Sequence, residues 1–136
     1  YSKFEIVKLT PQQQEILEDF AYNSYRPCCS NPTAFPDCNH GMAALALGEI
    51  MAASGATAEE IFDAFKYVNA FWFPQTYFDA ASYFKAKEGK DWSQVDSRLV
   101  AGKDFSTPQG WSMVRNWLKT NNLLEEPPSG GGSCGV

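Results

Sequence analysis

The stretch CNHGMAALALGEIMAASGATAEEIFDAF at residues 38–65 decides the fold, because it predicts two helices and the short connection between them. Its first half is rich in alanine and glycine and lacks proline, and Gly55 ends it, so we expect a helix over about 38–54. Thr57 and Glu60 have the spacing of a capping box, which predicts a second helix directly afterwards. The small side chains of the first helix allow neighbouring backbones to approach closely. We therefore expect that helix to be central in the fold.

Helical signals also lie on both sides of this stretch. Threonine followed by proline is typical of a helix cap and first helical position, and such pairs occur at 10–11 and 107–108. A helix is also expected over 75–86, after Pro74, and a short one near 96–102. Apolar residues recur at helical spacing in three of these segments: Ile16, Leu17, Phe20 and Ala21; Phe78, Ala81 and Phe84; Trp111, Val114, Trp117 and Leu118. Almost nothing alternates as a strand does, so the sequence predicts an all-α bundle of five or six helices.

The chain has 136 residues, which is the size of one domain, and 44% of them are hydrophobic, which is enough for a sizeable core. We predict a helical metal-binding domain at 1–124 and a flexible Gly-rich tail at 125–136 that carries Cys134. The net charge is −5 and no Lys/Arg block is present, which argues against a nucleic-acid partner. The first residue is Tyr1, which is compatible with signal cleavage, removal of a membrane anchor or a trimmed chain.

A long loop is expected over 23–37, because its prolines disfavour helix. Long loops in compact domains tend to be functional or disordered, and the cysteine pair with Tyr25 and Phe35 favours a functional loop here. This loop contains Cys28 and Cys29, and the helix start after it contains Cys38 and His40, the one histidine of the chain. Soft and borderline metals prefer thiolate and imidazole ligands. We therefore predict a metal site formed by these four side chains.

Two further side chains are optional ligands of this site. Met42 lies four residues after Cys38 and could share its helix face, although a lone methionine is more often core packing. Cys134 could reach back from its glycine-rich segment, remain unpaired, or pair with another chain.

The spacing of the predicted ligands sets conditions on the backbone. Adjacent residues in an extended segment point to opposite sides, so Cys28 and Cys29 can bind one metal only if the chain turns sharply there. Cys38 and His40 share a metal best if the helix begins at Asn39 or His40, with Asp37 or Asn39 as the cap. A helix start also lowers the pKa of a cysteine.

Copper is the favoured metal and zinc the close alternative. Three thiolates and an imidazole fit Zn(II) in tetrahedral geometry, whereas low-coordinate thiolate sites fit Cu(I), or Hg(II) as a toxic mimic. Calcium and magnesium are disfavoured because no carboxylate cluster accompanies the motif.

Two other hypotheses explain the same cysteines. The first is a helical binding module stapled by disulfides such as Cys29–Cys38, with no metal. The second is a thiol redox protein that uses the same two cysteines. The sequence shows no Ser/His/Asp constellation, so a binding protein is preferred to an enzyme. The aromatic residues at 71–84 are expected in the core, and the sharper alternative is that Trp72, Tyr77 and Tyr83 form an apolar wall around the metal.

Residues 26–65 resemble the Cys-rich bacterial lipoproteins defined by a PCYCGC motif. Pro27-Cys28-Cys29 stands where that family has its first Cys cluster, and Cys38 precedes the Ala-rich helix. The chain departs from the family because it lacks the Cys-x-Cys-x-Cys spacing and has one Cys and a His before the helix, where the family tends to show two Cys. The resemblance implies an extracytoplasmic, soft-metal-binding domain of a bacterial or archaeal cell envelope, tethered to the membrane through a removed N-terminal segment. No protein partner can be identified from it.

Overall fold

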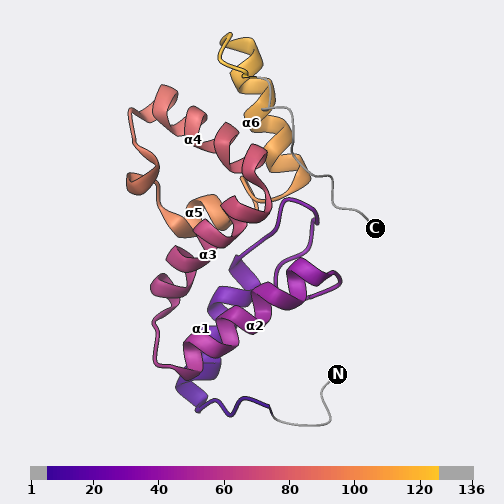
Figure 1. The fold of residues 1–136 in the computed structure, drawn as a ribbon, viewed down its shortest axis with the longest axis vertical. Helices are drawn as coiled ribbons and strands as arrows, with labels where there is room; N and C mark the ends of the chain where they lie inside the picture. The colour runs from indigo at the N-terminus through magenta and orange to yellow at the C-terminus, as the bar shows by residue number, and fades with distance from the viewer. Residues whose placement is uncertain (1–5, 126–136) are drawn as a thin grey trace.

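The computed structural model describes residues 6–125, and within that range the protein consists of six α-helices and one short 3-10 helix, without a β-strand (Figure 1). The elements are α1 (Pro11–Asn23), α2 (Asn39–Ala53), α3 (Ala58–Trp72), α4 (Pro74–Glu88), η1 (Trp92–Gln94), α5 (Ser97–Ala101) and α6 (Pro108–Thr120). The predicted all-α fold is therefore confirmed. Cys134 and the predicted tail beyond Glu125 lie outside the described residues.

Local capping explains where the helices begin. The Thr10 side chain accepts a hydrogen bond from the Gln13 amide, and the Gln13 side chain accepts one from the Thr10 amide. The same reciprocal box joins Thr57 and Glu60 at the start of α3. Each box satisfies backbone donors that a helix start leaves unpaired, so these boundaries could be predicted from the sequence.

The central helix of the structure is α3. We had expected α2 to be central because of its small residues, and that expectation was wrong. On one side α3 packs against α1 and α2, where Phe20 meets Phe62 and Phe65 edge to face at centroid distances of 5.3 and 5.2 Å. On the other side it contacts α4 and α5. By contrast, one face of α2 is open, with Met42 53% and Ile50 57% exposed.

The small residues of α2 nevertheless act as expected on its buried face, which consists of Gly41, Ala44, Gly48 and Ala52. Glycine at position 48 lets α1 approach so closely that a Cβ there would lie 2.7 Å from Cδ1 of Phe20. This close contact sets how the middle of α2 packs on α1.

The buried face of α4 differs from the spacing that predicted this helix. Phe84 is buried as its place in the pattern suggests, but Phe78 is 46% exposed. Tyr77 and Ala80 fill the core in its place, at seven and four residues before Phe84. Both sets of residues fit a helical period, and the packing of α4 on α6 and η1 selects one of them.

The long loop between α1 and α2 is held to three helices by backbone and side-chain hydrogen bonds. The Tyr25 amide donates to the Ala101 carbonyl at 2.8 Å, and the Asn69 side chain donates to the Tyr25 carbonyl at 2.9 Å. Further along, the Ala34 amide donates to the Ala21 carbonyl at 2.8 Å. These contacts fix both ends of the segment that carries the cysteine pair.

Candidate metal centre

A tight turn brings the adjacent cysteines of the loop to one side. The Cys29 amide donates a hydrogen bond to the Arg26 carbonyl at 3.0 Å, which closes the turn around Pro27 and Cys28. Proline fixes its own φ at a value that suits such a turn. The sharp turn required for Cys28 and Cys29 to face one site is therefore present.

Cys28, Cys29 and Cys38 come together in what we call the thiol cluster. The Sγ–Sγ distances are 3.3 Å for Cys28–Cys29, 3.7 Å for Cys29–Cys38 and 3.9 Å for Cys28–Cys38. All three thiols are free, and they form a group that could hold a metal ion. A tetrahedral ion with metal–sulfur bonds of 2.3 Å separates its sulfur ligands by about 3.8 Å, so a metal fits with small adjustments.

The third thiol is placed by the helix start. Cys38 is itself the N-cap of α2, where we had expected Asp37 or Asn39, and its Sγ accepts a hydrogen bond from the Gly41 amide at 3.4 Å. Burial acts to raise the pKa of Cys38, but the Gly41 amide, the other two thiols and Arg26 outweigh it and lower that pKa below its ordinary value. The helix start thus favours a thiolate at Cys38.

The pKa values of the other two thiols are raised above their ordinary value. Burial raises the pKa of Cys28, and the adjacent Cys29 and Cys38 raise it further. Burial also raises the pKa of Cys29, although Arg26 acts against this effect. Cys38 is therefore the thiol of the cluster that ionises most readily, and the sulfur atoms of Cys28 and Cys29 lie 3.9 and 3.7 Å from its own.

Arg26 lies buried beside the thiol cluster, and the sequence did not single it out. Its side chain is fully buried, with one terminal nitrogen 3.3 Å from the Thr33 hydroxyl and the other 3.3 Å from an Asp37 carboxylate oxygen. Its Nε has no hydrogen-bond partner among the residues that the structure describes. A buried, positively charged side chain is suited to balance thiolates next to it. The one signal in the sequence was an arginine directly before the Pro-Cys-Cys motif.

His40 is not part of the thiol cluster. Its ring packs against Trp72 and Phe73 at centroid distances of 5.1 and 4.9 Å, where α3 ends and α4 begins. Met42 follows on the first turn of α2 with a largely exposed side chain. Cys134, the other optional ligand, lies outside the described residues. Three of the six predicted ligands are thus brought together in the described part of the chain.

The three aromatic side chains considered for a wall around the metal lie in different places. Trp72 contacts His40 close to the start of α2. Tyr77 is buried in the second core cluster, where its hydroxyl group hydrogen-bonds to Ser106 at 2.7 Å. Tyr83 packs edge to face on Trp117 at 4.9 Å. The core explanation therefore holds for Tyr77 and Tyr83.

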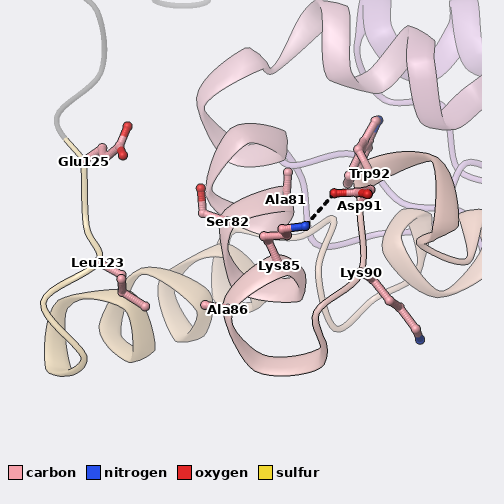
Figure 2. Close-up of a pocket in the computed structure, with 9 residues that line it drawn as sticks. All are labelled: Ala81, Ser82, Lys85, Ala86, Lys90, Asp91, Trp92, Leu123 and Glu125. Atoms are coloured by element: carbon pink, nitrogen blue, oxygen red, sulfur yellow. Dashed lines mark hydrogen bonds and ion pairs between the residues drawn. The ribbon is translucent and has the colours of Figure 1, made fainter.

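A separate hollow of about 440 Å³ lies between α4, the segment after it and residues 123–125. In Figure 2, Lys85 points toward Asp91, and the two form an ion pair at 2.7 Å while Lys90 points away. Both partners are exposed, and ion pairs of this kind contribute little. The lining residues include neither cysteine nor histidine, so this hollow offers no thiolate or imidazole ligand to a soft metal.

Comparisons with protein-family models, curated proteins and solved structures found no match. In residues 6–125 there is no helix with the length and apolar character needed to span a membrane. The candidate function therefore depends on the chemistry of the thiol cluster itself.

Proposed function

We propose that the protein binds a soft metal ion through the thiol cluster and handles that metal outside the cytoplasm. The observation that carries this proposal is the approach of three free Sγ atoms, from two separate places in the chain, to within 3.9 Å of one another. Thiolates select soft ions such as Cu(I) and borderline ions such as Zn(II) over calcium and magnesium.

Copper is the favoured ion because the cluster offers three sulfur ligands and no fourth residue of a usual type. Among the described His, Cys, Asp and Glu side chains, only these three cysteines form a group close enough to share an ion. Cu(I) is stable with few thiolate ligands, whereas Zn(II) in proteins is nearly always four-coordinate. Zinc would need a water molecule, or Met42, in the fourth position. We keep zinc as the alternative ion.

The cell-envelope location is supported by the resemblance of residues 26–65 to the PCYCGC-motif lipoproteins. Expression of the full-length protein in a bacterial host, followed by fractionation, would show the protein with the envelope. Recovery in the cytoplasm alone would contradict this part of the proposal.

Anaerobic titration with Cu(I) against a colorimetric chelator tests the metal itself. We expect one copper ion per chain, and a loss of affinity of about 100-fold or more when Cys38→Ser or Cys29→Ser removes one of the three arms. Cys134→Ser is made in parallel, because Cys134 is the remaining cysteine of the chain and was predicted as an optional ligand. Unchanged copper affinity in this variant would limit the site to the thiol cluster. Equal copper binding by the chain that lacks all three cluster cysteines would refute the proposal.

A second candidate function is thiol redox chemistry, and the lowered pKa of Cys38 is the observation that favours it. A thiolate at a helix start with two thiols within 3.9 Å resembles a nucleophile with its resolving partners. Turnover of a small disulfide by the metal-free protein, lost in Cys38→Ser, would support this function. A metal-free protein without such turnover would leave metal binding as the function.

A further inference from the structure

We propose that the thiol cluster also captures trivalent arsenic, as arsenite or as a monosubstituted arsenical. This rests on the proposed function, because the same three sulfur atoms are the ligands. It extends that function from metal ions to a thiophilic metalloid that takes three sulfur ligands and keeps a lone pair.

The shape of the cluster suits a pyramidal centre. A flat three-coordinate ion with bonds of 2.3 Å to sulfur would separate its ligands by about 4.0 Å. All three Sγ–Sγ distances are shorter, from 3.3 to 3.9 Å. A centre with a lone pair lies out of the plane of its ligands, so its ligands draw closer together than those of a flat centre. The observed triangle is small enough for a pyramidal three-coordinate centre, as it is for a tetrahedral ion.

The side of the cluster that faces solvent is also suitable. Cys28 is exposed, while Cys29 and Cys38 are half-buried. A lone pair needs no ligand, so an open fourth position is no disadvantage for a trivalent centre. For zinc the same position has to be filled by a further donor.

Charge gives a third reason. With three thiolates, a monovalent ion leaves two negative charges on the cluster, a divalent ion leaves one, and a trivalent centre leaves none. The positive charge beside the cluster is that of Arg26, which is already paired with Asp37 at 3.3 Å. Uncompensated charge in a partly buried site is costly. The neutral arsenic complex therefore needs no compensating charge from the residues around it.

The capture step needs no oxidant or reductant. Arsenous acid, As(OH)₃, reacts with three thiols to form three As–S bonds and three water molecules. Each hydroxide leaves with one thiol proton. Arsenic remains trivalent, and the sulfur atoms keep the oxidation state that they have in a thiol. A monosubstituted arsenical carries one carbon group and therefore takes two thiols and releases its oxygen as water.

Titration of the reduced full-length chain with sodium arsenite tests this directly, with intact mass and free-thiol count as readouts. We expect one arsenic atom per chain and the loss of three free thiols, both in the native chain and in Cys134→Ser. Phenylarsine oxide should consume two thiols instead of three. Arsenite uptake that consumes fewer than three thiols, or uptake by the chain without the cluster cysteines, would overturn the assignment.

Single variants separate the three arms. Cys28→Ser and Cys38→Ser should each weaken arsenite binding by about 100-fold or more, because each removes one arm of a three-armed chelate. Thermal unfolding of the same samples shows whether a variant is still folded. Cys28→Ser is the safer variant, since Cys28 is exposed and caps no helix. Unchanged affinity in a folded Cys28→Ser chain would contradict three-thiol capture.

Copper titration of the same samples keeps this inference distinct from the proposed function. Copper binding at the cluster without arsenite binding would overturn the arsenic inference and leave the soft-metal function standing. Arsenite binding through three thiols without copper binding would support the inference and refute copper as the metal. Binding of neither would refute both the arsenic inference and copper as the metal.

Discussion

The guanidinium of Arg26 lies against the backbone of Gly41, so that a Cβ at position 41 would be 3.1 Å from Arg26 Cζ. Gly41 is also the residue whose amide donates to the Sγ of Cys38. The first turn of α2 therefore contacts a buried cation and a thiol acceptor at the same point. Substitutions at this contact should affect metal binding and stability together.

Gly41→Ala should weaken copper binding, because the new methyl group displaces either Arg26 or the Pro36 backbone, whose Cα would be 3.0 Å away. The steric cost is about 1–3 kcal/mol, and alanine in place of glycine within a helix recovers about 1 kcal/mol of it. We expect a modest loss of stability in urea denaturation and a clear loss in copper affinity.

Gly48→Ala is the matched control, since it adds the same methyl group on the same helix but against Phe20 at 2.7 Å. It should lower stability and leave copper affinity of the folded protein unchanged. Equal effects of the two variants on affinity would show that the Arg26–Gly41 contact has no particular part in the site.

The removal of the Arg26 charge gives a second prediction. Arg26→Met should destabilise the protein by about 1–3 kcal/mol, because it breaks buried hydrogen bonds to Thr33 and Asp37. It should also weaken copper binding by about tenfold, or ~1.4 kcal/mol, because the anionic metal complex loses its neighbouring cation. Denaturation curves and chelator competition measure the two effects separately.

Arg26→Lys and Asp37→Asn distinguish charge from packing in this prediction. Arg26→Lys keeps the charge and should recover part of the copper affinity. Asp37→Asn removes the anion that pairs with Arg26, and should leave copper affinity unchanged or raise it. A drop in affinity for Asp37→Asn as large as for Arg26→Met would indicate that the loop conformation, and not charge, is what matters.

The helix starts and the grouping of the cysteines could be predicted from the sequence, whereas the role of Arg26 could not. The helix starts at Thr10 and Thr57 were predictable because each capping box is made by residues three apart. The cluster of cysteines was predictable from their proximity in the sequence. The role of Arg26 was not, because its burial depends on how the loop packs against α2 at Gly41, which no local sequence pattern shows.

The position of His40 was missed for a related reason. Its spacing from Cys38 indicated a ligand at the helix start, and α2 does begin at Asn39. The direction of the imidazole is determined by Trp72 and Phe73, which lie more than 30 residues further along the chain. No local pattern contains that information, because it depends on how α3 and α4 pack against the start of α2.

The pH dependence of thiol reactivity follows from the three shifted pKa values. Cys38 has a lowered pKa, whereas Cys28 and Cys29 have raised ones. At neutral pH, iodoacetamide should therefore label Cys38 of the metal-free protein first, as shown by peptide mapping after short exposure. First labelling at the more exposed Cys28 would mean that exposure, and not ionisation, governs reactivity.

The same shifts fix the sign of the pH dependence of stability. A lowered folded-state pKa at Cys38 stabilises the protein above the unfolded thiol pKa, and this contribution is lost as the pH falls through the folded value. Raised values at Cys28 and Cys29 act in the other direction: they stabilise below the unfolded pKa and are lost as the pH rises through the folded values. Cys38→Ser should remove the first dependence and reduce the second, because Cys38 is one of the groups that raise the pKa values of Cys28 and Cys29. Urea denaturation at several alkaline pH values measures both changes.

His40→Ala gives a prediction that separates the structure from the sequence pattern. The imidazole packs on Trp72 and Phe73 and lies outside the thiol cluster. Its removal should therefore lower the stability of the protein and leave copper binding unchanged. Aromatic contacts of this kind contribute about 0.5–1.5 kcal/mol each. We expect a lower melting temperature with the copper stoichiometry and affinity of the native chain. His40→Phe should restore much of the stability, because it keeps the aromatic contact without the nitrogen atoms. If His40→Ala and His40→Phe instead weakened copper binding equally, His40 would be a ligand in the metal-bound state, and binding would have to rotate the ring away from Trp72 toward the sulfur atoms.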